Sequence, residues 1–524
     1  MRLVAAVVCA AALVSASANA QTTASPPPVP AGPLTLEQVL NLAEARSESI
    51  AIAQEDVKRS VGQELRAKSG LFPQLTASVS YDRALASEFS GLSFGGGDSS
   101  GSGGSDGIDT SELPFGRVNT WRLNLNVSQN LFDFGRIKAQ RAVAAAGHDS
   151  ADISLTTTRA QLLFDVTQAY YNAVLSDRMV SIAEATIRQA NATLEQTEAG
   201  LRAGTQPEFE VLRARVSRDA QNPNLIRQRL NRGVALLRLK QLLDLPADYD
   251  LELAEQLGDD VAAPAPVFAQ RISSIEAKVN VANVTQVPLD ASTVSTPDRT
   301  AVKQVASAVT LREAALAAVR AQKMPAVALT SNYGRVAYPE NVVAPTFDRT
   351  NWTVGVNVSV PVLTGGRQKA DEVVAQADLD QTRIQLRQVE ELAALDSRSA
   401  LAELVASRAA WEATAGTVEQ AQKAFQLADV RYQAGVSTQL ELSDSRLLLQ
   451  LAEANRAVAA RDLQVARARV ALLPDLPLGT VTPSGQQQLT APSAPTPQQT
   501  PQGGGTQLQN ASFQGGGAQL GGMQ

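Results

Sequence analysis

The chain has 524 residues, and its 46 Lys and Arg against 52 Asp and Glu leave a mild formal net charge of −6 at pH 7. No basic stripe with interleaved aromatic residues suggests a nucleic-acid partner. The only cysteine, Cys9, and the only histidine, His148, show no catalytic or metal-ligand spacing, so we expect no metal, no cofactor and no enzymatic activity.

Residues 1–20 have the pattern of a signal peptide. Arg2 precedes an apolar run that ends at Ala18-Asn19-Ala20, an A-x-A cleavage pattern. We therefore expect export and cleavage, which removes Cys9 and leaves a mature chain without thiol chemistry. No later segment offers the roughly 20 apolar residues that a membrane-spanning helix requires. The Pro-rich residues 21–33 predict a flexible N-terminus.

A helix and a pair of strands come next. The pattern from Leu34 to Gly70 predicts a helix with Thr35 as its N-cap. Apolar and polar residues then alternate in two stretches within 73–130, on either side of the Gly/Ser-rich run 95–107, which predicts a flexible loop. Such alternation suits tilted membrane β-strands with lipid on one face and water on the other. An amphipathic soluble sheet would show the same pattern.

The strands lead into a long helix that turns back on itself. Residues 136–202 contain no proline and predict one helix of about 100 Å at 1.5 Å per residue. A break at Gly204 precedes a shorter helix from Glu208 to Asp244, which Pro223 should kink or shorten. A soluble coiled-coil rod would explain these helices equally well.

A second half repeats this order after residues 244–297, where prolines and acidic residues predict an insertion around the helical body. The second half, 298–473, predicts a helix, a strand pair within 325–363, a long helix and a shorter helix from Gln439 to Leu473. The second long helix should span 367–433, and Gly435 should end it. The residues from 474 to 524, rich in Gln, Gly and Pro, predict a disordered tail.

The halves 34–243 and 298–473 are an internal repeat with an offset of 231 residues. The segment NLFDFGRIKAQRAVAAA at 130–146 matches PVLTGGRQKADEVVAQA at 361–377. Four strands cannot close a membrane barrel, because every edge must be paired and the smallest single-chain barrels have about eight strands. Two copies would give a nearly filled barrel, whereas three would give twelve strands around an aqueous pore.

This repeated order of elements resembles the TolC family of outer-membrane factors, up to about Leu473. FPQL at 72–75, LFDFGR at 131–136 and PVLTGGR at 361–367 stand at the strand–helix borders. The resemblance implies a mixed fold: a membrane β-barrel of twelve strands, four from each protomer of a homotrimer, continued by a long α-helical coiled-coil barrel through the periplasm. It also implies contact with outer-membrane lipid and docking, through a periplasmic adaptor (membrane fusion) protein, on an inner-membrane ABC or RND transporter.

Four residues mark the borders between strands and long helices. Gly135 and Gly366 would allow a tight bend. The arginines that follow, Arg136 and Arg367, can donate hydrogen bonds to carbonyls or acidic groups there. Simple solvation near the membrane interface is the alternative for both arginines.

Glu441 and Asp444 lie three residues apart just after the Gly435 turn and therefore share a helix face. Threefold symmetry would place six carboxylates in a ring that attracts cations. The family match implies that this ring lines the periplasmic entrance. A solvated helix start, stabilised by the helix dipole, is the alternative.

Tyr432 and Glu210 resemble the family's gate partners, which implies a hydrogen bond between them that holds the entrance shut. Ser437 stands where the family pattern has an arginine, so a charged lock is not expected. Arg213 and Arg446 are nearby alternatives for that missing arginine.

The helix turns are implied to contact the adaptor through residues around Leu201, Gly204, Gly435 and Val436, although the glycines could simply cap the helices. The alternative function is a soluble periplasmic coiled-coil adaptor or scaffold, against which the four alternating strands argue. Type I secretion of a protein, efflux of drugs and export of metal ions all remain open as the cargo.

Overall fold

A computed structural model of the chain describes residues 32–85, 119–255, 264–276, 296–339, 347 and 349–478. All of them belong to one compact unit, Met1–Gly479, and a second unit, Thr480–Gln524, lies outside the described residues. The predicted signal peptide, residues 21–31 of the predicted flexible N-terminus, the Gly/Ser run at 95–107 and the predicted tail from 479 onward also lie outside them.

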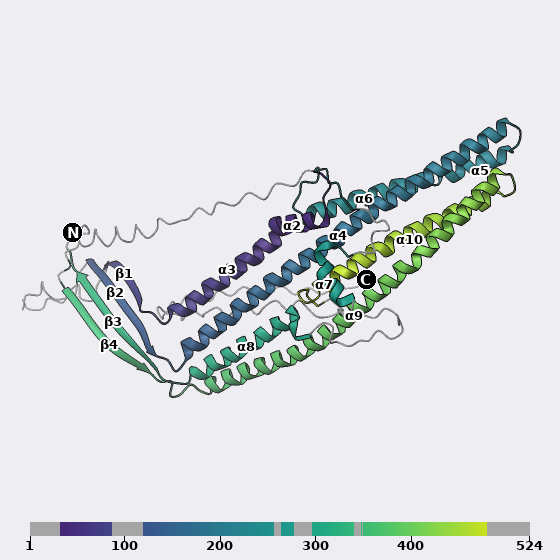
Figure 1. The fold of residues 1–524 in the computed structure, drawn as a ribbon. Coiled ribbons are helices and arrows are strands. Elements are labelled where there is room, and N and C mark those ends of the chain that lie inside the picture. The colour runs from purple at the N-terminus through teal and green to yellow at the C-terminus, as the bar shows by residue number, and fades with distance from the viewer. Residues whose placement is uncertain are drawn as a thin grey trace, which may run out of the picture. The chain divides into compact units, whose positions relative to one another are not determined.

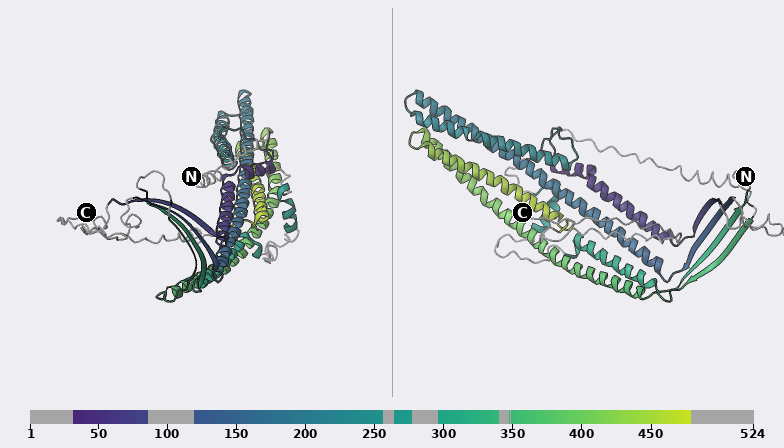
Figure 2. Two further views of the ribbon diagram at one scale, coloured as in Figure 1. Left: turned by 90° about the vertical axis from the view of Figure 1, so that its left-hand side faces the viewer. Right: turned by 180° about the vertical axis from the view of Figure 1, so that it is seen from behind.

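Four strands form one antiparallel sheet, as the alternation predicted (Figure 1). They are β1 (Gln74–Arg83), β2 (Asn119–Phe132), β3 (Ala326–Ala337) and β4 (Arg349–Ser359), in the order β1-β2-β3-β4. The strands lie side by side and curve together in both views of Figure 2. Because β2 and β3 belong to different halves of the repeat, their pairing joins the two halves.

The sheet has an apolar face and a polar face. On the apolar face Tyr81 pairs with Trp121 and Tyr333 with Trp352, with ring centroids 5.0 and 6.5 Å apart. The other apolar positions on this face include Leu75, Ala77, Val79, Leu123, Leu125, Val127, Val354, Val356 and Val358. The opposite face carries mainly Asn, Ser and Thr, together with the ion pair of Arg122 with Asp82 at 2.6 Å. This arrangement is typical of a barrel wall with lipid outside, water inside and an aromatic belt at the interface.

Two long helices continue the strands with the predicted bounds. They are α4 (Arg136–Arg202) and α9 (Arg367–Gln433), each of 67 residues. The shorter helices are α2 (Leu36–Arg46), α3 (Glu48–Ser69), α5 (Glu208–Asp219), α6 (Asn222–Leu242), α7 (Pro266–Glu276), α8 (Thr300–Ala321) and α10 (Gln439–Leu472), with a 3-10 turn η4 (Thr296–Asp298). In the described part of the chain, no helix is both long and apolar enough to cross a bilayer.

Shorter helices laid end to end cover each long helix, because no single shorter helix is long enough to do so. α3 and then α5 with α6 pack along α4, whereas α8 and then α10 pack along α9. α8 also packs on α4, and so does α10. The two halves are therefore held together by helices as well as by the sheet.

Two predicted helices are divided. The helix expected over 34–70 breaks at Ser47, whose Oγ accepts a hydrogen bond from the Ile50 N–H and starts α3. Thr35 is the N-cap of α2, as predicted, in a reciprocal capping box with Gln38. Pro223 lies in the first turn of α6, where a missing N–H costs no helix bond, so the break falls just before it.

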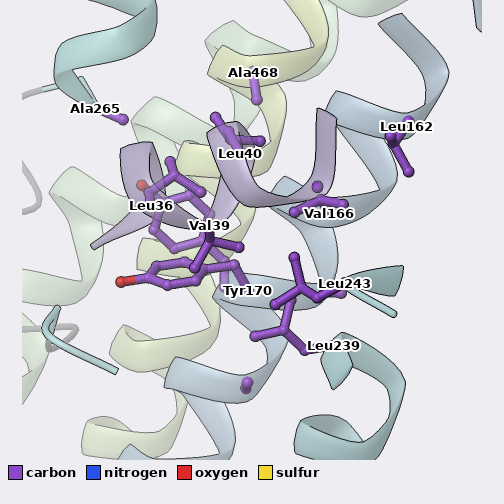
Figure 3. Packing of buried hydrophobic residues seen from close by; sticks show 14 of the residues in the cluster. Leu36, Val39, Leu40, Leu162, Val166, Tyr170, Leu239, Leu243, Ala265 and Ala468 are labelled. Carbon is purple, nitrogen blue, oxygen red and sulfur yellow. The ribbon is translucent and has the colours of Figure 1, made fainter. Parts of the chain in front are cut away.

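The main hydrophobic core lies where both halves meet (Figure 3). Its labelled members include Leu36 and Val39 of α2, Val166 and Tyr170 of α4, Leu239 of α6 and Ala468 of α10. The Tyr170 hydroxyl donates to the Leu34 carbonyl at 3.3 Å. Burial raises the pKa of Tyr170 above its ordinary value, so the hydroxyl stays protonated and keeps this donor.

Residues 244–297 contribute to this core rather than only surrounding it. Leu253 forms a parallel bridge with Leu34, and Phe268 and Ile272 of α7 are buried in the core. α7, which the sequence did not predict, packs on α10, where Arg271 donates to the Ala471 carbonyl at 3.3 Å.

Packed structure continues to Leu478, past the predicted start of the tail at 474. The fully buried Arg299 donates to Asp396 at 2.8 Å and to the Leu476 carbonyl at 3.4 Å. The Thr300 N–H donates to the Pro474 carbonyl at 2.8 Å. A buried guanidinium paired with a carboxylate thus fixes the end of the described chain against the start of α8.

The same bend joins strand to long helix in both halves. Gly135 and Gly366 have φ of +88° and +84°, in the left-handed region that favours glycine. At each bend a backbone N–H donates to a carbonyl at 3.1 Å, Arg136 to Asp133 and Arg367 to Thr364. The two predicted bends are therefore one local structure used twice.

The arginine side chains at these bends do not make the contacts that the sequence suggested. Arg136 and Arg367 are both exposed. Among the described residues, neither guanidinium has a hydrogen bond or an ion pair. Solvation, the alternative interpretation, accounts for both.

The bend before α9 gives a test of stability. In Gly366→Ala the new side chain must adopt a left-handed backbone, which costs about 1–2 kcal/mol. Nothing lies within 4 Å of a Cβ added there, so the cost should come from the backbone alone. The control is Gly416→Ala, inside α9 and equally open, which should stabilise by up to about 1 kcal/mol. Denaturant unfolding in detergent measures both changes, and equal shifts would contradict the strained bend.

Candidate functional site

The described helices form two hairpins. Hairpin 1 is α4 with α5 and α6, and hairpin 2 is α9 with α10. Their turns are alike, since Gly204 and Gly435 have φ of +74° and +71°. After each glycine, a backbone N–H reaches back at 2.9 Å, from Thr205 to the Gly200 carbonyl and from Val436 to the Arg431 carbonyl. This is the Schellman ending of a helix, so the glycines do cap their helices.

The residues of the two turns are exposed. Leu201 is 39% and Val436 70% exposed, and Gly204 and Gly435 are exposed beside them. Their apolar side chains are therefore accessible to another protein. Their contact with an adaptor stays a prediction.

Polar side chains join hairpin 1 to hairpin 2 near these turns. We call the following three pairs the inter-hairpin contacts: Tyr432 with Thr197, Gln439 with Glu210, and Arg446 with Thr193. The atoms are 3.3 Å apart between the Tyr432 and Thr197 hydroxyls, and 2.7 Å between Arg446 Nη2 and the Thr193 hydroxyl. The Gln439 amide nitrogen, assigned from its hydrogen-bond partners, donates to Glu210 Oε2 at 2.8 Å.

The predicted hydrogen bond between Tyr432 and Glu210 is absent, because each side chain has a different partner. Tyr432, only 8% exposed, packs with Ala428 and Leu442, and this packing aims its hydroxyl at α4. Glu210 lies in the first turn of α5 and faces the start of α10, where Gln439 stands. Both residues join the hairpins, but not to one another.

The structure distinguishes the two arginines proposed near the gate. Arg446 is 7% exposed and belongs to an inter-hairpin contact. Arg213 has no hydrogen bond or ion pair with any described residue. Ser437 donates to the Ala428 carbonyl at 3.5 Å, within its own hairpin, so it adds nothing between the hairpins.

The two carboxylates of the predicted ring differ in their contacts. Glu441 pairs with Arg431 at 3.1 Å across the turn of hairpin 2. Asp444 is exposed and has no partner among the described residues. Arg431 therefore offsets one of the two carboxylate charges at this turn, and the ring around an entrance stays a prediction. Thr438 caps the Glu441 N–H at 3.4 Å, which agrees with the helix-start interpretation.

The contacts between the hairpins change character along their length. Near the turns each hairpin has its own small apolar cluster: Leu194, Val211 and Ala214 in hairpin 1, and Ala428, Tyr432 and Leu442 in hairpin 2. Farther from the turns, α4 and α10 share the main core. Separating the turns would therefore break polar contacts of about 0.5–3 kcal/mol each, whereas separating the middle would expose the core.

Comparison with known proteins supports one class. The family model of outer membrane efflux proteins matches residues 39–244 and 297–478. The pyoverdine export outer membrane protein OpmQ of Pseudomonas putida is 26% identical over 438 residues, which cover 80% of this chain and 82% of that protein. Nodulation protein T of Rhizobium leguminosarum bv. viciae is 22% identical over 352 residues, 66% of this chain and 65% of that protein.

Solved structures show the same fold. The outer membrane protein VceC of Vibrio cholerae gives a TM-score of 0.63 at 16% identity, covering 84% of this chain and 96% of its own. The CmeC outer membrane channel of Campylobacter jejuni gives 0.63 at 15% identity, covering 84% and 86%. Both are similar to this chain in fold.

The apolar-faced sheet, the two long helices that continue it and the hairpin turns define a TolC-like outer-membrane channel, a β-barrel of twelve strands from three protomers continued by a helical barrel. The chain belongs to the outer membrane efflux protein family. It is an exit duct for export, and the alternative of a soluble adaptor or scaffold is wrong.

The contact between Tyr432 and Thr197 can be tested by a double-mutant cycle. Tyr432→Phe and Thr197→Val each remove one hydroxyl, and we expect a coupling free energy of about 0.5–1.5 kcal/mol between them. Thr186→Val is the matched control, because the buried Thr186 hydroxyl bonds only the Ile182 carbonyl of its own helix. Unfolding of the detergent-solubilised protein measures the coupling, and equal values for Thr197 and Thr186 would remove the contact from the site.

Proposed function

We propose that the chain acts as a homotrimer in the outer membrane of a Gram-negative cell, as a passive duct that the inter-hairpin contacts hold closed at its periplasmic end. The observation that carries the proposal is the open sheet: among the described strands, β1 and β4 each have one neighbour. Unpaired strand edges are not tolerated in lipid, so other copies must supply their partners.

The apolar face of the sheet supports contact with lipid. Val354 and Val356 are 63% and 62% exposed, and Trp352 is 70% exposed. An apolar surface of this kind would be a liability in water, whereas lipid covers it at no cost. Export to this membrane would use residues 1–20 as a cleaved signal peptide.

Efflux channels of this family work with adaptors and inner-membrane transporters. We propose that a periplasmic adaptor docks on the exposed turns around Leu201 and Val436, and that an inner-membrane ABC or RND transporter supplies the energy. The duct itself then needs no catalytic residue and no cofactor. The relative OpmQ is a pyoverdine export protein, which favours a small molecule over a secreted protein as cargo.

Single-channel conductance of the purified protein in planar bilayers tests this function. Discrete openings from the detergent-extracted trimer are expected. A folded, membrane-extracted protein that forms no pores would contradict the duct.

Two substitutions that change the charge at the proposed entrance in opposite directions test its role. Asp444→Asn should lower the preference for cations over anions and Arg431→Gln should raise it, each by roughly twofold or more, because one charge about 8 Å away in water contributes about 0.5 kcal/mol. Reversal potentials in a salt gradient measure this preference. A preference that neither substitution changes would place these charges outside the path of the ions.

A further inference from the structure

The two hairpins use one pair of equivalent residues in different ways. At the offset of the repeat, Arg215 corresponds to Arg446 and Glu198 corresponds to Asp429. In hairpin 1, Arg215 pairs with Glu198 at 3.2 Å, inside its own hairpin. In hairpin 2 the equivalent ion pair is not formed. Arg446 donates instead to Thr193 of hairpin 1 at 2.7 Å.

The Arg446 guanidinium is poorly satisfied where it lies. It is buried, its observed hydrogen bond is to a neutral hydroxyl, and its Nε has no hydrogen-bond partner among the described residues. Burial lowers the pKa of Arg446, and the nearby Asp429 opposes that shift. A buried cation is favoured by a carboxylate or several acceptors, and in this contact the guanidinium lacks both.

Asp429 meanwhile stays available inside hairpin 2. Its carboxylate accepts a hydrogen bond from Gln433 at 2.9 Å, a neutral partner on the same helix. The turns of the two hairpins share the same glycine and the same backbone hydrogen bonds, so the path from Asp429 to Arg446 is the one that Glu198 and Arg215 already bridge. In the structure the Arg446 guanidinium reaches toward Thr193 of hairpin 1 and forms no ion pair with Asp429.

We propose that Arg446 is a two-position switch: it holds hairpin 2 to hairpin 1 through Thr193 when the duct is closed, and pairs with Asp429 of its own hairpin when the hairpins separate. This inference rests on the proposed function, since it assigns the switch to the opening of that duct. Opening then exchanges a bond to a neutral oxygen for an ion pair, which offsets part of the loss of the other inter-hairpin contacts. The ion pair of Arg215 with Glu198 in hairpin 1 is the template for the pair that Arg446 would form with Asp429.

Substitutions on the two sides of the switch should act in opposite directions. Thr193→Val removes the closed partner and should raise the open probability roughly fivefold, whereas Asp429→Asn removes the open partner and should lower it by a similar factor. Asn at 429 can still accept from Gln433, so the closed contact is kept. The matched control is Glu198→Gln, which breaks the equivalent pair in hairpin 1 and should leave the open probability unchanged.

Arg446→Met separates a switch from a merely structural residue. In the Arg446→Met background, Asp429→Asn and Thr193→Val should each lose their effect on open probability. If Asp429→Asn acts like the Glu198→Gln control in the wild-type background, the switch is overturned.

A distance measurement keeps the test independent of conductance. Cysteines at the exposed Ala203 and Ala434 can carry spin labels, because the chain's only cysteine is Cys9 in the predicted signal peptide. In trimers diluted with unlabelled chain, Thr193→Val should populate a longer distance between the labels and Asp429→Asn should not. The same distances for both variants would overturn the switch. Failure of the wild type to conduct, with the distances shifted as expected, would overturn the proposed duct alone.

Discussion

Every backbone N–H and C=O group inside a bilayer needs a partner, because the hydrocarbon offers none. The described sheet has four strands and two unpaired edges. This lack of edge partners explains two further features of the molecule. It requires several copies, and it requires each strand pair to leave the membrane through a bend that does not disturb the pairing. The left-handed glycines Gly135 and Gly366 provide this bend twice, and the long helices α4 and α9 begin directly after them.

Away from the sheet, the kind of packing between the hairpins changes along the length of the helices. The middle of the hairpins is fixed by a core that draws on α2, α4, α6, α7 and α10 and by the buried pair of Arg299 with Asp396. The ends are joined by hydrogen bonds between polar side chains. These bonds fix one geometry, but replacing them with bonds to water costs little free energy. The proposed gating, in which the duct stays shut until a partner opens it, is consistent with this combination, because a continuous apolar seam would make opening too costly.

Much of the fold could be predicted from the sequence. Proline-free runs and the repeat indicate the bounds of α4 and α9, and the alternation of apolar and polar residues indicates the strands. The partners of the site residues could not. Whether Tyr432 reaches Glu210 or Thr197 depends on the rotation of α9 against α4, which packing decides and no motif records. Thr197 belongs to no recognisable pattern, and the pairing of Arg431 with Glu441 depends on the geometry of the Gly435 turn.

The repeat has one more consequence for the assembled trimer. Two like hairpins in each of three protomers place six turns around the axis, an arrangement close to sixfold symmetry. The residues on those turns break it, because Gly200 and Leu201 in hairpin 1 correspond to Arg431 and Tyr432 in hairpin 2. The arginine of each turn therefore lies at a different position: Arg202 in hairpin 1 corresponds to Gln433, and Arg431 in hairpin 2 corresponds to Gly200. A partner built from six identical subunits would meet two different surfaces, and would have to bind both or use every second one.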